Sequence, residues 1–414
     1  MNEERYIVNI GLGPWQTPLV EAAQAMGYRV IGVDINPDAP GAAGADSFLR
    51  MSAHEPGPIR DALTKLDLGG AVIRAVITIG SRGSLTCAGV LARDLDVRGR
   101  VVDLEALDTL VDREKFRSFL QRHGLAVPIY RVVTSSEMEI DIPLPLIAKS
   151  VLDTSGSEGL TVVRERSDLC DAIRHAQKIP RHGMDGRVIV EQYIEGRDIG
   201  VFGFFSDGEL YWQAFVDREV EPMPHCLPKH YSAPATLSEI EISVLNDNFC
   251  RIAQAIAVAD GPFYAEFRLV EDGPACYALE AEPTLPAYAT RLLADAYAID
   301  PYRHFVETVV EGQVAPIVAE PGAAACRFVY GQSPGRIGRI ERPERLSNGS
   351  EIRVLQRVGA SVDNASARSI CAVAFAVAKN VDVANQRAGK LADQVEVEIE
   401  PAVPLSEAPA STPH

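Results

Sequence analysis

The stretch YALEAEP (277–283) decides the fold, because it places two acids two residues apart in an apolar run. Read as a β-strand, this stretch alternates faces, so Glu280 and Glu282 point the same way. Fourteen residues before Glu280, the apolar stretch FYAEFRL (263–269) contains a single acid, Glu266. Two such strands would place carboxylates on one shared face. A solvated sheet face and a site for a divalent cation are the two explanations.

Length and composition limit what kind of protein this is. The chain has 414 residues, 47% of them apolar, which is too long for one ordinary core and indicates several packed units. A net charge of −17 disfavours a nucleic-acid or anionic-membrane partner, because neutralising phosphates requires a basic surface. Seven scattered cysteines without a CxxC pair favour a reducing compartment. With no signal-peptide pattern and no membrane-length apolar stretch, we expect a globular, cytoplasmic α/β protein.

Changes of pattern along the chain predict three regions and a tail. Strands alternate with helices at first, which predicts a parallel sheet with ligands at the carboxyl ends of its strands. Short strands with glycine turns predict a mostly-β region near the end, and the Pro/Ser/Ala-rich tail is expected to be disordered. The predicted units are residues 1–103, a central domain at 104–314 with a lid at about 128–194, a β-rich cap at 315–400, and the tail 401–414.

Two central segments have the residue types of a nucleotide site. Lys149 ends an apolar strand shortly before the loop TSGSEG (154–159), where backbone N–H groups and a lysine can bind phosphate oxygens. A lysine at a strand end is, however, more often a solvated edge. In VEQYIEGRD (190–198), backbone groups can pair with an adenine edge, Glu191 can accept from its amine, and Asp198 can hold ribose hydroxyls. A plain edge strand is the alternative explanation.

The segment GLGPWQ (11–16) imitates a dinucleotide-binding fingerprint without completing it. Gly11 and Gly13 follow a first strand, and Asp34 ends the second. Gln16 stands where the third glycine belongs, and the neighbouring proline and tryptophan would crowd a pyrophosphate. We interpret the segment as a tight strand-to-helix turn, or as a loop lining a substrate pocket, and disfavour nicotinamide binding.

Four motifs in one order resemble the ATP-grasp superfamily. They are DREK (112–115), IAK with TSGSEG (147–159), VEQYIEGRD (190–198) and AEF…YALEAEP (265–283). Each is weak alone, but four in order with family-like spacing are specific. The resemblance covers about residues 1–400 and includes a front domain like those that precede ATP-grasp modules. It implies an α/β ATP-grasp fold with an N-terminal Rossmann-like domain and a small β-rich C-terminal cap, similar to the biotin carboxylase architecture.

The resemblance also implies roles for individual residues, with ATP and Mg²⁺ (or Mn²⁺) as ligands. Two lysines contact phosphates, a glycine-rich loop closes over them, and a strand end reads adenine chiefly through its last two backbone units. These ATP-binding residues are Lys115, Lys149, Ser155, Gly156, Ser157, Gly159, Glu191, Gln192, Tyr193, Ile194 and Asp198. The implied metal ligands are Glu266, Glu280 and Glu282. The implied catalytic arginines are Arg327 and Arg268, with Arg291 and Lys229 as weaker candidates.

Two positions depart from the family pattern. Glu282 stands where relatives usually have asparagine, so either it binds metal or it turns aside. Thr284 stands where many relatives have an arginine that stabilises an acyl phosphate, so another cation must do that work.

The resemblance implies an ADP-forming ligase that makes C–N bonds. Such an enzyme activates a carboxylate as an acyl phosphate and joins it to an amine, here an amino acid or a similar small metabolite. An ATP-dependent carboxylase that activates bicarbonate, of the biotin carboxylase or purine-pathway type, is the alternative. A nucleotide sensor without chemistry is a third possibility, although a sensor need not keep Lys149, Glu266 and Glu280 together. The expected partners are small-molecule substrates, possibly with a second copy of the chain in a homodimer.

Overall fold

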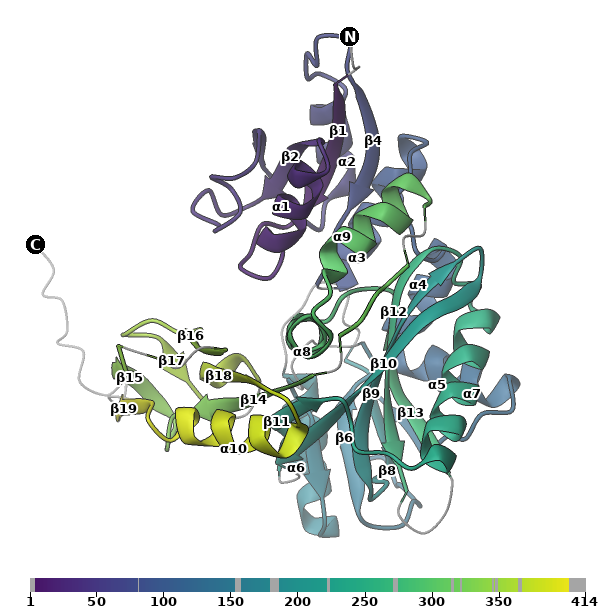
Figure 1. Cartoon of the computed structure of the whole chain (residues 1–414). Helices are drawn as coiled ribbons and strands as arrows, with labels where there is room; N and C mark the ends of the chain where they lie inside the picture. The colour runs from purple at the N-terminus through teal and green to yellow at the C-terminus, as the bar shows by residue number, and fades with distance from the viewer. Residues whose placement is uncertain are drawn as a thin grey trace, which may run out of the picture.

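Three regions follow one another along the chain in the computed structural model, which Figure 1 shows. It describes residues 4–401 except residues 81, 153–157, 179–185, 222–223, 271–274, 314–315, 321, 345, 347–348 and 364–366. The expected disordered tail therefore lies almost wholly outside the described residues. Within them, no helix combines the length and the apolarity that crossing a membrane requires.

The front domain is a parallel sheet covered on both faces, as the alternating pattern predicts. Its four strands have the order β3-β2-β1-β4. Alternate residues of β1 enter different cores, since Ile7 packs with Leu19 of one helix and Val8 packs with Leu91 of another. The strands are β1 (Arg5–Ile10), β2 (Arg29–Asp34), β3 (Ser47–Arg50) and β4 (Val72–Ile77), and the helices are α1 (Thr17–Ala25), α2 (Pro56–Leu63) and α3 (Arg82–Asp94).

The central region begins with two helices and a small antiparallel sheet of order β5-β8-β6-β7. Asp112 is the N-cap of the second helix, because its side chain accepts the N–H of Lys115 at 3.0 Å. These elements are α4 (Leu104–Val111), α5 (Arg113–Arg122), β5 (Tyr130–Val133), β6 (Leu146–Ser150), β7 (Thr161–Val163), α6 (Leu169–Gln177) and β8 (Val188–Gln192), with a 3₁₀ turn at Arg166–Asp168.

A larger antiparallel sheet faces the small one. Its first two strands form a hairpin, which turns at Asp207 and Gly208, both with positive φ (+50° and +81°). A capping box between Ser238 and Glu241 begins the long helix that packs on this sheet. The elements are β9 (Arg197–Ser206), β10 (Glu209–Glu221), β11 (Leu227–Ala233), α7 (Glu239–Ala255), β12 (Gly261–Leu269), β13 (Cys276–Glu282), α8 (Ala287–Tyr297), α9 (Pro301–Phe305) and the π-helix η2 (Val306–Glu311).

The cap extends this larger sheet instead of forming a sheet apart. The strand order is β13-β12-β9-β10-β11-β14-β18-β16, so β11 of the central region pairs directly with β14 of the cap. A three-stranded sheet, β17-β15-β19, completes the cap. The cap elements are β14 (Ala323–Tyr330), β15 (Gly335–Glu341), β16 (Ser350–Val354), β17 (Ser361–Val362), β18 (Ile370–Ala378), α10 (Val381–Ala392) and β19 (Glu396–Glu400), with a 3₁₀ turn at Ala367–Ser369.

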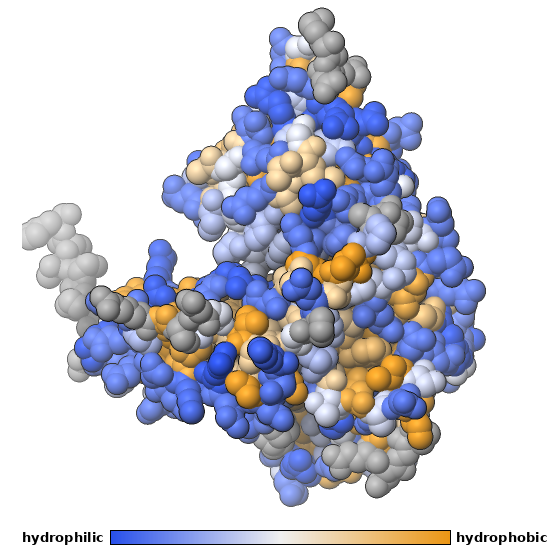
Figure 2. Space-filling model, viewed as in Figure 1, coloured by the Kyte–Doolittle hydropathy of each residue, from blue (hydrophilic) through white to orange (hydrophobic). Residues whose placement is uncertain are grey.

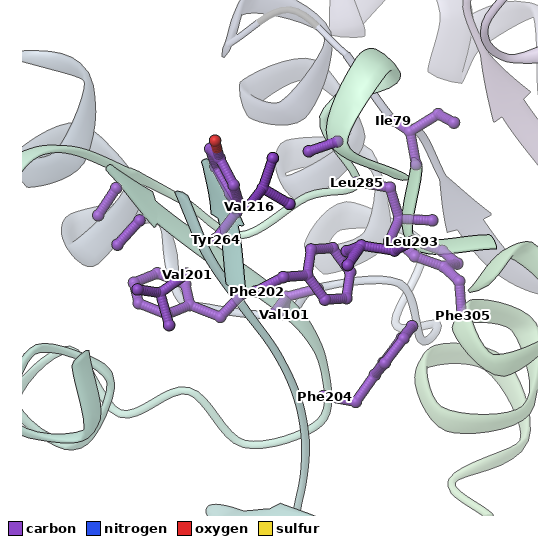
Figure 3. Packing of buried hydrophobic residues seen from close by; sticks show 14 of the residues in the cluster. Ile79, Val101, Val201, Phe202, Phe204, Val216, Tyr264, Leu285, Leu293 and Phe305 are labelled. Atoms are coloured by element: carbon purple, nitrogen blue, oxygen red, sulfur yellow. The ribbon is translucent and has the colours of Figure 1, made fainter. Parts of the chain in front are cut away.

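One hydrophobic core joins the front domain to the central region. Figure 3 shows Ile79, which follows β4, and Val101, which follows α3, in one cluster with Leu285 and Phe305 of the central region. All four side chains belong to the same cluster of buried residues. The front domain is therefore fixed to the central region by apolar burial, and not only by its connecting chain.

Candidate functional site

A pocket lies between the two sheets of the central region, and we call it the inter-sheet pocket. Strands β6 and β8 of the small sheet supply one wall, and strands β10, β12 and β13 of the larger sheet supply the other. Most of the predicted site residues line it, namely Lys149, Glu191, Gln192, Tyr193, Ile194, Asp198, Arg268, Glu266 and Glu280. Segments that are up to 131 residues apart in sequence are thus brought to one place, as the resemblance implies.

Three buried charges meet beside this pocket. Lys149 on β6 forms an ion pair with Glu191 on β8. Glu191 also accepts two hydrogen bonds from Arg117 of α5, from Nε to Oε2 at 3.0 Å and from Nη2 to Oε1 at 3.3 Å. Arg117 is fully buried, and its Nη1 donates to the carbonyl oxygens of Ala278 and Leu279 on β13 at 3.2 Å each. The cluster therefore ties α5 and both sheets together around the pocket.

The neighbouring charges set the protonation of this cluster. Burial alone would raise the pKa of Glu191, but Arg117 and Lys149 outweigh it and lower that pKa to about 2. Burial lowers the pKa of Lys149, and the nearby arginines lower it further, while Glu191 opposes both effects. Because the oxygens of Glu191 already accept from two cations, we assign it the role of counter-ion to Lys149 rather than that of an acceptor for adenine.

The strand end that is predicted to read adenine is held by backbone hydrogen bonds. The N–H of Gln192 donates to the carbonyl of Ile129 at 2.8 Å, and the N–H of Tyr193 donates to the carbonyl of Pro145 at 3.0 Å. This segment lines the inter-sheet pocket as an ordered edge. Its position suits contact with a flat base, and the adenine role remains a prediction.

Arg268 holds the same end of the pocket and lies away from the paired acids. Its guanidinium forms an ion pair with Asp198, donates to the carbonyl of Ile194 and lies 5.2 Å from the ring centre of Tyr193. Arg268 does share a strand with Glu266, but its contacts with Asp198, Ile194 and Tyr193 are at the predicted nucleotide-base end. We therefore interpret Arg268 as a residue that orders the binding edge, and its catalytic role stays an untested prediction.

The two acids of the opening stretches face each other across neighbouring strands. Glu266 on β12 and Glu280 on β13 are direct partners in the antiparallel register. Each is also beside an arginine, since Arg218 of β10 pairs with Glu266 and Arg113 of α5 donates to Glu280 at 3.2 Å. Like charges placed directly opposite each other are destabilising, so this arrangement needs cations.

The pKa of Glu266 reports that need. Burial is the largest cause that raises the pKa of Glu266 to about 7; Arg218 opposes this rise, and Glu280 adds to it. Two carboxylate oxygens together with phosphate oxygens are the ligands that Mg²⁺ prefers. The two facing acids therefore fit a divalent cation that is shared with a nucleotide.

The third predicted metal ligand, Glu282, is on the same strand as Glu280, and its metal-binding role stays a prediction. Glu282 pairs in register with Tyr264 and does not line the inter-sheet pocket. In the described part of the chain, no three Asp, Glu, His or Cys side chains come together so as to hold a metal ion. The two-acid set, completed by phosphate oxygens, is the arrangement that the geometry supports.

Comparison with known proteins agrees with this geometry. Residues 142–288, which contain most of the pocket residues, match the ATP-grasp domain family. The chain carries an ATP-grasp domain. Its structure resembles that of an L-amino acid ligase from Bacillus licheniformis with a TM-score of 0.78 and 15% identity, over 97% of this chain and 100% of that one. The likeness shows a shared fold, so the predicted ATP-grasp architecture is confirmed.

Two further proteins resemble the chain, one in structure and one in sequence. A biotin carboxylase from Campylobacter jejuni has a TM-score of 0.72 and 18% identity, over 95% of this chain and 92% of that one. The uncharacterized protein y4rH of Sinorhizobium fredii is 22% identical over 306 residues, which is 71% of this chain. That match spans 62% of y4rH, less than two thirds of its length.

Lys115 does not reach the pocket of the ATP-grasp domain. Its side chain is 51% exposed and pairs with Asp108 at 2.5 Å. Two residues earlier, Arg113 is buried and donates to the carbonyls of Ser150 and Leu152 as well as to Glu280. Two helical positions differ by about 200° around the axis, so only one of these cations can face the site. The structure gives that place to Arg113.

Arg327 of the cap also differs from its predicted place. It pairs in register with His230, and its neighbour Cys326 pairs with Tyr231. Tyr231 accepts a hydrogen bond from Arg218 at 3.0 Å, whereas His230 contacts Asn385 of α10 at 2.6 Å. Alternate residues of a strand point to opposite faces, so Arg327 lies on the α10 face, away from the paired acids.

The glycine-rich loop is described only in part. Ser155, Gly156 and Ser157 lie outside the described residues. Gly159 is buried, with a φ of +72° that favours glycine, and the next residue, Leu160, lines the inter-sheet pocket. The C-terminal end of the loop therefore lies at the pocket wall, and the phosphate-binding role of the loop remains a prediction.

The front domain is not arranged for a dinucleotide. The amide of Gln16 donates to the carbonyl of Ile79 at 2.8 Å, and a Cβ on Gly13 or Gly80 would lie within 2.8 Å of that amide group. The side chain thus fills the space between the two turns, as its place in the motif suggests. Asp34 accepts the N–H of Leu12 at 2.8 Å, so it serves its own loop.

Aromatic side chains connect the three regions near the site. Tyr231 of β11 lies edge-on to Phe328 of β14 at 4.9 Å, and Phe328 contacts Tyr288 of α8 at 4.9 Å. Tyr288 then meets Trp15 of the front domain at 5.1 Å. The guanidinium of Arg353 from the cap lies 4.7 Å from the Trp15 ring centre. Figure 2 shows a notch between the front domain and the cap. The contact of Arg353 with Trp15 joins these two regions.

Sequence reasoning missed three arginines, namely Arg113, Arg117 and Arg218. A signal exists for each. The first two are four residues apart, on the helix face that also carries Phe116 and Leu120. Arg218 follows Ala214 and Val216 at alternate, inward positions of β10. A charged residue at an apolar position is a candidate for a buried ion pair.

Thr284 is buried where an arginine was expected from the family pattern. Its hydroxyl accepts the N–H of Gly80 at 3.3 Å, and the residue is 1% exposed. Thr284→Arg should therefore reduce the free energy of unfolding by about 2 kcal/mol or more, because overpacking and a buried charge both cost stability. Chemical unfolding would measure this, with Thr284→Ser, which keeps the hydroxyl, as the control. Equal stability of all three proteins would contradict the burial.

Proposed function

We propose that this protein is an ATP-dependent carboxylate–amine ligase that acts on an amino acid or a similar small metabolite. One observation carries the proposal: buried Lys149 lies in the same pocket as the facing acids Glu266 and Glu280. Phosphoryl transfer to a carboxylate brings two anions together, and this set offers charge on both sides of their meeting point. The fold shared with an L-amino acid ligase supports this choice.

The proposed reaction has two balanced steps. A carboxylate oxygen of the acid attacks the γ-phosphorus of ATP, the bond to the β–γ bridging oxygen breaks, and an acyl phosphate and ADP result. The amine nitrogen then attacks the acyl carbon, a C–N bond forms, inorganic phosphate leaves and the amine releases a proton to water. Both steps transfer groups without transferring electrons, so no group on the chain changes its oxidation state.

The chain's own residues would assist both steps. Lys149 would neutralise phosphate charge at the pocket wall. Glu266 and Glu280 would hold Mg²⁺, which when bound neutralises phosphate oxygens. Arg113 and Arg218, which contact these acids, would hold them in place. Arg218 pairs with Glu266 and lies on β10. Strand β10 pairs with β11, which in turn pairs with β14 of the cap. We infer that Arg218 supplies part of the charge that the family pattern places at position 284.

A hydroxylamine assay tests the proposal. The purified chain is incubated with Mg-ATP, hydroxylamine and one carboxylic or amino acid at a time, and hydroxamate and ADP are both measured. Hydroxamate formed with one acid, and absent in Glu280→Gln, supports the ligase. ADP release that depends on bicarbonate, without hydroxamate from any acid, would favour a carboxylase. The fold that the chain shares with a biotin carboxylase is compatible with that outcome. ADP formation with neither would contradict both.

The two lysines of the implied ATP set form a matched pair. Lys149→Ala should raise the KM for ATP by roughly ten- to a hundredfold, because a charged hydrogen bond to phosphate is lost. Lys115→Ala should change it less than about threefold, since that side chain is exposed and pairs with Asp108. Steady-state kinetics would measure both, with thermal unfolding to check the fold. The same KM in the two variants would contradict the distinction between them.

A further inference from the structure

Three arginines line a second cavity, apart from the inter-sheet pocket. It has a volume of about 530 Å³, within the range of ligand sites. The start of β4 supplies Arg74, and the turn after α3 supplies Arg98 and Arg100. The π-helix η2 supplies the opposite wall with Val309 and Val310. Figure 1 shows α9, which leads into this π-helix, against the front domain. None of these residues lines the inter-sheet pocket.

Main-chain hydrogen bonds hold the backbone of Arg98 against that of β4, which carries Arg74. Val76 donates its N–H to the carbonyl of Arg98 at 3.0 Å, and Arg98 donates its own N–H to the carbonyl of Arg74 at 3.3 Å. The following residue, Gly99, has a φ of +128°, and a Cβ there would lie 1.8 Å from the Val76 oxygen. Only glycine permits this close approach. The turn is thus held against β4, with Arg98 beside Arg74.

The charges of the three guanidinium groups are not balanced within the chain. Among the described residues, no carboxylate lies within 4.0 Å of Arg74, Arg98 or Arg100 in an ion pair, although the chain has 57 acids for 40 lysines and arginines. Asp96 and Asp260 also line the cavity, and Asp260 accepts the N–H of Asp207 at 3.1 Å. The guanidinium groups outnumber these carboxylates and repel each other, so an anion bound between the arginines would be stabilised.

The cavity also spans two regions. Nη1 of Arg98 donates to the carbonyl of Val310 at 3.5 Å, and a Cβ on Gly312 would lie 2.2 Å from the same nitrogen. Arg98 therefore reaches from the front domain onto the end of the π-helix. Such helices are rare and often mark functional sites.

We propose that this cavity is a second ligand site, for a small anion that carries two or three phosphate groups. Three guanidinium groups call for a multiply charged partner, and the planar fork of arginine matches phosphate oxygens. Because both regions line the cavity, the bound anion stabilises their contact. This site is independent of the ligase activity proposed above, since it shares no lining residue with the inter-sheet pocket.

Calorimetric titration of the full chain with inorganic tripolyphosphate, without Mg²⁺ and at fixed ionic strength, tests the proposal. Wild-type protein should bind, and Lys149→Ala should keep this binding component. Arg98→Gln combined with Arg100→Gln should weaken it roughly a hundredfold, about tenfold for each guanidinium lost. Arg93→Gln, which changes an exposed arginine of α3 outside the cavity, is the matched control and should bind as wild type does.

Three results would overturn the site. They are no binding by wild type, equal binding by the double variant, or binding that is lost in Lys149→Ala instead. Citrate, titrated in parallel, separates phosphate recognition from general anion binding, and tighter binding of citrate would also refute the proposed ligand class. If the double variant fails to fold, Arg100→Gln alone decides the question, because the main-chain and π-helix contacts of Arg98 then stay intact. It should bind about tenfold more weakly.

Discussion

Arg117→Met is expected to lower the free energy of unfolding by about 3–5 kcal/mol, because it leaves buried Glu191 with only one of its two cations. The variant also loses two hydrogen bonds to carbonyls of β13. Urea unfolding followed by circular dichroism would measure the change. Methionine fills a similar length of buried space, so the loss would report charge and hydrogen bonding more than an empty cavity.

The same helix offers the control. Arg122 lies in the last turn of α5 and is exposed, so Arg122→Met should change stability by less than about 0.5 kcal/mol. Arg117→Lys keeps the charge but not the two-pronged contact, and it should fall between the other two. If Arg117→Met were as stable as Arg122→Met, the cluster around Glu191 would not stabilise the fold.

Lowering the pH should weaken the interaction of Glu191 with Arg117 and so reduce the free energy of unfolding. The pKa of Glu191 is lowered to about 2 from its usual 4.5, so its ionised form stabilises the fold above pH 4.5. That contribution is lost as the pH falls from about 4.5 towards 2. In Arg117→Met the folded pKa lies closer to 4.5, so this part of the acid loss should shrink.

Glu280→Gln should reduce ATP-dependent turnover by about a hundredfold or more, since it removes one of the two facing carboxylates proposed to hold the metal. It should also weaken the dependence of the rate on Mg²⁺ concentration. Arg113, which contacts Glu280, keeps its hydrogen bonds to two backbone carbonyls, so the fold should survive. ADP release and hydroxamate formation would measure the effect across a magnesium titration.

Glu282→Gln is the matched control on the same strand. Glu282 lies two residues further on and does not line the inter-sheet pocket, so its variant should keep turnover within about threefold. A large loss in Glu282→Gln would show that the third acid does bind the metal. Full activity in Glu280→Gln would remove the two-acid site altogether.

The sequence predicts local order better than it predicts long-range partners. The spacing of YALEAEP and FYAEFRL places Glu280 and Glu266 on one face, and the antiparallel register does pair them. The order of motifs predicts the ATP-grasp fold, because that order reflects which strands meet. By contrast, Arg117 finds Glu191 74 residues away, and only the packing of α5 on both sheets brings them together.

Lys115 and Arg327, whose observed positions differ from the predicted ones, illustrate the same limit. For DREK, the choice between Arg113 and Lys115 depends on the phase of a helix against a distant strand, which the N-cap alone does not set. For Arg327, the sequence predicts a β-rich region, but the face on which its side chain lies depends on the pairing of β14 with β11, and 89 residues lie between these two strands. A shift of one residue in that register would turn Arg327 towards the acids.

The pairing of β11 with β14 has a practical consequence for the construction of chimeric proteins from this chain and its relatives. A chain cut before the cap would leave β11 with a row of unpaired backbone groups, an edge at which other molecules could add. The cap is therefore not an exchangeable module that can be grafted at a linker. A chimera that transfers the cap from a relative must preserve the pairing of β14 with β11, because the strands of both regions form one hydrogen-bonded sheet.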